Sequence, residues 1–119
     1  MAISVGATLS NSGNQTTSSG FSFAHTTDTS TKCLVVVVTG VDASATDSVV
    51  SSVVWDSVGA NESLTEIAGG RYRVGNDFIS IWYKSLPSIL SAKNVTVSMG
   101  GACTDVQASA INLVDASAI

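Results

Sequence analysis

The stretch "TKCLVVVVTGVD", residues 31–42, contains an uninterrupted apolar run from Leu34 to Val38. Membrane segments, strands before phosphate-binding loops and buried β-strands all contain such runs. A membrane helix needs about 18 apolar residues or more, whereas this run ends at Thr39 and Gly40. A phosphate loop needs a lysine at fixed spacing and a helix after it, and the following "TGVDASATD" has neither. The run therefore predicts a central β-strand that is apolar on both faces.

Short runs rich in β-branched residues recur on both sides of this strand, and clusters of Gly, Asn, Asp and Ser separate them. No segment has a helical period, so the pattern is typical of an all-β sandwich. The expected strands cover residues 3–9, 21–27, 33–41, 48–56, 63–69, 77–85, 94–100 and 105–114. About eight antiparallel strands in two sheets fit a jelly roll, which we prefer to a seven-stranded immunoglobulin-like sandwich.

The 119 residues are expected to form one domain, 1–119, with a core that needs no metal or disulfide. Residues 1–19 predict an N-terminal strand, "ISVGATL", followed by a polar arm, because "NSGNQTTSSG" (11–20) is polar and of low complexity. The N-terminus lacks the basic region and continuous apolar core of a signal peptide. We therefore expect synthesis and assembly in the cytoplasm.

Charged residues make up only 12% of the chain, about half the usual share. Hydroxyls and amides must therefore solvate much of the surface. The net charge of −4 provides no basic footprint, which argues against nucleic acid as a partner and gives no reason to expect binding to an anionic membrane.

Two cysteines, Cys33 and Cys103, and one histidine, His25, are too few for a zinc site. We expect both cysteines to be buried thiols. The alternative, a disulfide between two strands, applies if the protein matures in oxidising surroundings.

No catalytic signature is present. His25 with Asp28 and a serine would form a hydrolase triad only if a strained turn held the nucleophile, and no G-x-S-x-G occurs. His25 is instead expected on a strand, bonded to a neighbouring hydroxyl. Glycines such as Gly40 and Gly75 are expected to supply positive φ at turns. We therefore predict no enzyme activity and no cofactor.

Aspartates fall at the expected strand ends, where some sandwiches bind calcium. Calcium needs six to eight converging oxygens, and no D-x-[DN]-x-[DN]-G loop occurs. We expect turn residues rather than a metal site at these positions, which are Asp42, Asp47, Asp56 and Asp77.

Aromatic residues predict a surface for a partner. Strand 77–85 places Phe78 and Trp82 opposite a second apolar face made by Ile79, Ile81 and Tyr83. Either both faces are used, or one lies in the core and the other under a loop. The segment "GGRYRVGND" (69–77) also brings scarce basic residues beside a tyrosine in an expected loop, and Arg, Tyr and Trp are enriched at interface hot spots. The predicted partner-binding residues are Arg71, Tyr72, Arg73, Phe78 and Trp82.

The order of these segments resembles a small β-sandwich module of phage virion proteins and bacterial secreted proteins. The resemblance spans Ile3 to Ser117, and its motifs concern core and turns rather than a site. They are Ala24-His25-Thr26, Leu34 to Val38, Val50 to Trp55, Ile81 to Pro87 and Val114-Asp115. Two departures stand out: Trp55-Asp56 replaces an aromatic followed by glycines, and Cys33 replaces a basic or polar residue.

A free-standing module of this kind is similar to phage capsid decoration (cement) proteins. The resemblance implies a non-enzymatic structural protein of a virion, assembled in the host cytoplasm, that binds the major capsid protein or another virion protein. The doubly apolar run from Leu34 to Val38 and the second face of strand 77–85 further predict self-association as a homotrimer. The alternative is a glycan-binding module of a tail fibre or of a bacterial adhesin. That module would need Trp55 or Trp82 exposed as a stacking platform.

Overall fold

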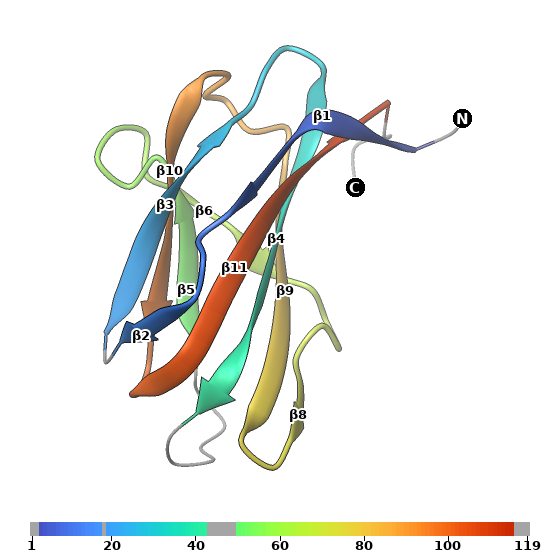
Figure 1. The fold of residues 1–119 in the computed structure, drawn as a ribbon. Helices are drawn as coiled ribbons and strands as arrows, with labels where there is room; N and C mark the ends of the chain where they lie inside the picture. The colour runs from blue at the N-terminus through green and yellow to red at the C-terminus, as the bar shows by residue number, and fades with distance from the viewer. Residues whose placement is uncertain (1–2, 18, 43–49, 116–119) are drawn as a thin grey trace.

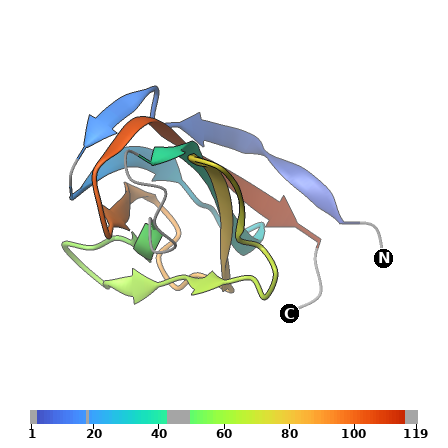
Figure 2. The same cartoon turned by 90° about the horizontal axis from the view of Figure 1, so that it is seen from below.

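Two antiparallel β-sheets face each other across a hydrophobic core in the computed structural model, which describes residues 3–17, 19–42 and 50–115 (Figure 1). Within these ranges no helix is long and apolar enough to cross a membrane. Seen from below, the two sheets form the layers of a sandwich (Figure 2). The expectation of an all-β antiparallel sandwich is confirmed.

Among the described residues, sheet A comprises seven strands and sheet B comprises four. The strands of sheet A are β1 (Ser4–Asn11), β2 (Gln15–Thr17), β4 (Thr31–Asp42), β7 (Thr65–Glu66), β8 (Tyr72–Val74), β9 (Asp77–Ser85) and β11 (Cys103–Val114). Those of sheet B are β3 (Gly20–Thr26), β5 (Val50–Trp55), β6 (Glu62–Ser63) and β10 (Ala92–Met99). The first two residues of the expected strand 48–56 lie outside the described residues.

The strand order favours a jelly roll. Without the short strands β2, β7 and β8, sheet A runs β1-β11-β4-β9 and sheet B runs β3-β10-β5-β6. The first strand pairs with the last, and successive long strands alternate between the two sheets. An immunoglobulin domain instead groups its strands as ABED and CFG, so the connectivity agrees with the jelly roll.

Short strands appear where loops or single strands were expected. Strand β2 lies in the predicted polar arm, and Gln15 and Thr17 pair with Val106 and Cys103 of β11. It forms because β1 covers only the second half of the long β11, which leaves the first half free to pair. The described part of residues 1–19 is therefore a paired edge of sheet A and not a free arm.

The expected strand 63–69 is divided between the sheets. Strand β6 pairs with β5 in sheet B, and β7 pairs with β9 in sheet A. The chain crosses between the sheets at Leu64, whose side chain is buried. The crossing closes one open side of the sandwich.

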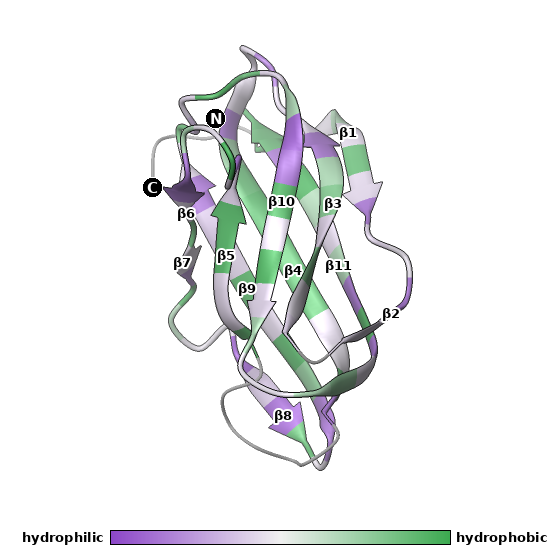
Figure 3. Ribbon diagram, turned by 90° about the vertical axis from the view of Figure 1, so that its left-hand side faces the viewer, coloured by the Kyte–Doolittle hydropathy of each residue, from purple (hydrophilic) through white to green (hydrophobic). Residues whose placement is uncertain are grey.

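The core lies between the inward faces of the two sheets. Leu34, Val36 and Val38 of β4 are fully buried, as are Val53 and Trp55 of β5. Figure 3 views the molecule from the sheet B side and shows hydrophobic residues along β4, β5 and β9. Burying one such side chain contributes about 1.5–3 kcal/mol, so the central strands supply much of the stabilisation.

Gly40 lies inside β4 and has a different role from the one expected. A Cβ atom at this position would lie 2.8 Å from the Cα of Val106. The pairing of β11 with β4 is irregular between Thr104 and Gln107, and this bulge brings the two backbones close together. Gly40 is therefore required by close approach between strands and not by a turn, whereas Gly75 has the expected positive φ of 59°.

Candidate functional site

The segment predicted to bind a partner forms a hairpin and not an open loop. Val74 pairs with Asp77, which leaves Gly75 and Asn76 as a two-residue turn between β8 and β9. The positive φ of Gly75 fits a type II′ turn. Because side chains alternate along a strand, Tyr72 points to the opposite side from the two arginines.

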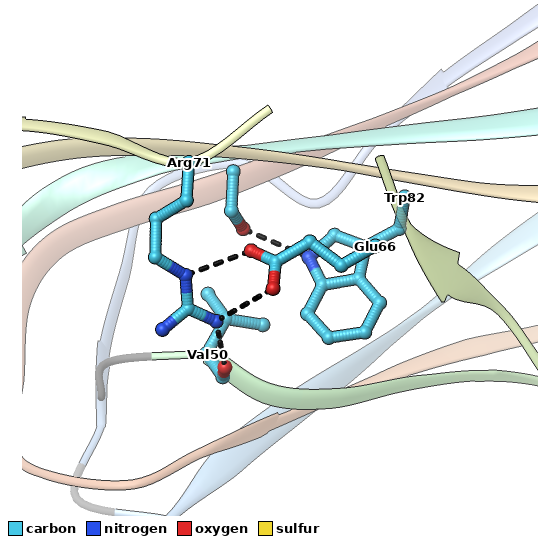
Figure 4. Close-up of polar contacts among 5 residues, drawn as sticks. Val50, Glu66, Arg71 and Trp82 are labelled. Carbon is cyan, nitrogen blue, oxygen red and sulfur yellow. Dashed lines mark hydrogen bonds and ion pairs between the residues drawn. The ribbon is translucent and has the colours of Figure 1, made fainter. Parts of the chain in front are cut away.

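Arg71 ties the edge of sheet A to sheet B (Figure 4). Its Nε and Nη2 atoms donate to the carboxylate of Glu66 at 2.7 and 3.2 Å, and Nη2 also donates to the carbonyl oxygen of Val50 at 2.8 Å. Glu66 lies on β7 and Val50 begins β5. Arg71 therefore has an internal structural role, and the expectation that it binds a partner has no support in these contacts.

Arg73 forms a more deeply buried ion pair. Its Nη2 atom donates to Oδ2 of Asp42 at 2.8 Å, and Nη1 donates to the carbonyl oxygen of Gly75. The Asp42 side chain is 1% exposed and that of Arg73 is 17% exposed. The pair joins the hairpin to the end of β4, so Arg73 is also engaged inside the chain.

Tyr72 is the candidate that lies on the surface. It is 68% exposed and pairs with Ile79 of β9. Val74, which is 62% exposed, points the same way. The hairpin therefore exposes one aromatic and one aliphatic side chain on the same side.

Phe78 and Trp82 belong to the core. They are 8% and 7% exposed, and the Trp82 indole donates to Ser80 Oγ at 2.8 Å. Both side chains lie on the inward face of β9. Neither is exposed enough to contact a partner, although the sequence predicts this role for both. Trp55 is fully buried as well. The stacking platform that a glycan-binding module would need is therefore not formed by either tryptophan.

The second face of the central strand forms part of a wide apolar surface. Residues opposite one another in register point to the same side of a sheet, and one such row crosses four strands through Leu9, Ile111, Val35 and Tyr83. We call the outward apolar side chains of these strands the sheet A face. Its residues are Val5, Leu9, Val35, Val37, Ile79, Ile81, Tyr83, Ile111 and Leu113.

Strand β1 contributes its apolar side to this face and its polar side to the interior. Val5 and Leu9 are 65% and 66% exposed, whereas Thr8 and Ser10 are half-buried. The apolar alternation from residue 3 to residue 9 predicts the strand correctly but does not tell which side faces out. The signal that was missed is the hydroxyl at alternate positions, which matches a polar group inside.

That polar group is His25. Its Nδ1 lies 2.9 Å from Ser10 Oγ, and its Nε2 lies 2.9 Å from Oδ1 of Asn112. Because the Asn112 amide nitrogen donates to the carbonyl oxygen of Thr26, its oxygen accepts from His25. Nε2 therefore carries the hydrogen, and Nδ1 accepts from Ser10.

The His25 cluster connects the sheets and does not resemble an exposed catalytic centre. The imidazole is 2% exposed and meets the Trp55 ring edge-on, with 6.1 Å between centroids. Burial lowers the pKa of His25, and the hydrogen bond to Asn112 opposes this shift more weakly. The expectation that His25 bonds a neighbouring hydroxyl from a strand agrees with the structure, and Asp28 instead caps its own turn through Ser30.

The outer face of sheet B has a different chemistry. Thr96 Oγ1 lies 2.8 Å from Ser22 Oγ and 2.9 Å from Ser57 Oγ. Ser51 donates to the carbonyl oxygen of Ser98 at 3.1 Å. Hydroxyls therefore line this side, so the two outer faces of the sandwich are unlike: one is apolar and the other is suited to water.

The described cysteines and acidic residues do not form a cluster that could bind a metal. Cys33 and Cys103 are buried free thiols, as expected, and burial raises the pKa of each. Across the part of the chain that the structure describes, no three His, Cys, Asp or Glu side chains converge in a way that could hold a metal. Asp47 lies outside the described residues.

No known protein family matches this chain, and neither a curated protein nor a solved structure gives a significant match. The sandwich fold implied by the sequence resemblance is present. The link to phage virion proteins remains an expectation from the motifs.

Proposed function

We propose that the protein is a non-enzymatic structural protein of a phage virion, a decoration protein that binds the capsid shell and stabilises it. The observation that carries the proposal is the sheet A face. Contiguous apolar patches of this kind mark interaction sites, and the opposite face is polar. A subunit with one apolar and one hydroxyl-lined face is suited to assemble through the first face and to keep the second in water, as a structural protein does.

The contact to the shell is assigned to the β8–β9 hairpin, with Tyr72 as its anchor. Tyr72 is 68% exposed, and the ion pairs of Arg71 and Arg73 on either side hold its strand in place. An anchor on a rigid element loses little conformational entropy on binding. Apolar area buried against the shell contributes about 25 cal/mol per Å², summed over many subunits.

The first test is to detect the chain by mass spectrometry in purified virus particles from its source. Absence from such particles would contradict the virion role. The second test measures rebinding of the purified protein to particles from which it has been removed. Tyr72→Ala should bind about 30-fold more weakly, because truncating an anchor costs about 2 kcal/mol.

Leu86→Ala is the matched control. Leu86 is 56% exposed and follows the last residue of β9, whereas Tyr72 lies beside the first residues of that strand. The control should bind as the wild type does. Equal binding by Tyr72→Ala would show that the hairpin is not the anchor, while leaving the virion role to the mass spectrometry.

A further inference from the structure

The centre of the sheet A face carries no charge. The outward positions of Val35–Val41 on β4, Ile79–Tyr83 on β9 and Gln107–Leu113 on β11 include no acidic or basic side chain. A charged partner would therefore find no oppositely charged side chain to pair with at the centre of this face. Two copies of the chain, each with a net charge of −4, can bring these centres together without placing like charges opposite one another.

The apolar part of the surface is also similar to the inner face of a sandwich, while Thr39, Gln107 and Ser109 add uncharged polar side chains to it. β-Branched and aliphatic side chains on regular strands interdigitate when two sheets pack about 10 Å apart. Val35 and Val37 on the outward side of β4 have the same chemistry as Val36 and Val38 on its buried side. A second sheet of the same kind is therefore a suitable cover.

The size of the face is sufficient for a stable contact. Four strands spaced about 4.8 Å apart and about eight residues long give a footprint of about 500 Å² on each copy. Two copies would bury about 1,000 Å² or more, which is the minimum expected of a biological interface. The estimate counts only the four long strands, and Tyr72, which is in register with Ile79, lies beside this footprint on the same side of the sheet.

We propose that a second copy of this chain covers the sheet A face, with the two A sheets packed face to face about a two-fold axis near Val37. In a two-fold contact the same patch is used on both subunits. Val37 lies midway along the outward positions of β4, and β4 is the middle strand of the order β1-β11-β4-β9-β7. Such a two-fold contact gives a closed dimer, whereas the sequence predicts a trimer.

The first experiment measures the mass in solution by light scattering or sedimentation equilibrium. The wild type is expected to form a dimer at micromolar concentration. Val37→Lys should be a folded monomer with dimer affinity at least 100-fold weaker, because it places a lysine in the centre of each half of the contact. Circular dichroism checks that the variant folds.

Val54→Lys is the matched control. Val54 is a half-buried valine on the outward side of β5, and it pairs with Thr96 and Ser63 in the other sheet. This variant should remain dimeric. Loss of the dimer in both variants would show a general effect of lysine on the sandwich and would overturn the assignment to sheet A.

A second experiment does not depend on lysine being tolerated. Val37→Cys should form a disulfide-linked dimer under mild oxidation, because the axis brings the two copies of the residue together. Val54→Cys should not, and the wild type should not because Cys33 and Cys103 are each 1% exposed. A failure of Val37→Cys to cross-link would overturn the two-fold arrangement.

Other occupants of the face would give different results. A monomer, or a trimer that Val37→Lys does not disrupt, overturns the proposal. So does a monomer whose sheet A face binds capsid protein or uncharged lipid vesicles in a Val37-dependent way. The inference refines the proposed function by naming what covers this face, yet it is measured on the isolated protein, so its failure is distinguishable from failure to bind particles.

Discussion

At the scale of single residues, Arg71 and Arg73 show how alternation along a strand separates neighbouring side chains. The sequence places both beside Tyr72, which favours one surface with three contact residues. In the structure the tyrosine points outward, and the guanidinium groups reach Glu66 and Asp42. Sequence proximity therefore does not indicate which of these three side chains is exposed.

The two ion pairs are expected to differ in their contribution to stability. Arg73→Ala leaves the carboxylate of Asp42 buried without this partner, and we expect a loss of about 3 kcal/mol. Arg71→Ala should cost about 1 kcal/mol or less, because its pair with Glu66 is 36% and 29% exposed. Urea unfolding of both variants measures the difference. Equal losses would contradict the role given to burial.

His25 predicts a dependence of stability on pH. Burial lowers its pKa below the ordinary 6.5, so the unfolded chain takes up a proton at a pH where the folded protein does not. This contribution to stability is complete above pH 6.5 and decreases as the pH falls from there towards the pKa of the folded state. Asp28, whose pKa is lowered by its hydrogen bonds to Ser30, acts only in a more acidic range, near and below 3.8.

The His25→Gln variant tests this titration. Urea unfolding in a series of buffers should show a variant that is about 1–3 kcal/mol less stable at pH 8, because buried hydrogen bonds are disturbed. Its stability should also change less than that of the wild type just below pH 6.5. Parallel profiles for the two proteins would show that another group titrates there.

At the scale of elements, the contact between β4 and β11 depends on a missing side chain. Gly40→Ala would place a Cβ against the backbone of Val106, at 2.8 Å, and is expected to cost about 1–3 kcal/mol. Gly101→Ala is the control, because a Cβ there meets nothing within 4 Å. Thermal unfolding of both variants checks the difference. A neutral Gly40→Ala would mean that the bulge in β11 can move away.

The sequence predicts that most of the strands exist. It does not predict which face of a strand is buried or where an expected strand is divided in two. Alternation in residues 3–9 identifies β1, because apolar side chains at every second position are typical of a strand. Residues 77–85 are apolar on both faces and identify β9 through their β-branched and aromatic residues. Which face of β1 is buried depends on His25 and Asn112, which lie on other strands, β3 and β11, so the pattern within β1 does not reveal it. Short strands such as β2 have no pattern of their own and form only because β11 leaves backbone groups to pair.

At the scale of the whole molecule, the sandwich follows from the distribution of turn residues and β-branched runs. Its candidate surface follows only in part. The doubly apolar run from Leu34 to Val38 indicates that the second face of the central strand needs a cover, and the structure shows this face extending over β1, β9 and β11. To predict that Phe78 and Trp82 are buried, one must know which face of β9 packs against sheet B, and the sequence does not show this.

The pairing of the first strand with the last also determines where an attached peptide would leave the molecule. Ser4 lies opposite Val114, and its hydroxyl donates to the Asp115 carboxylate at 3.2 Å. Figure 1 shows this corner at the other end of the sandwich from the β8 hairpin. A peptide epitope fused before β1 and one fused after β11 would therefore emerge side by side. The same corner would serve for display from either end, far from Tyr72.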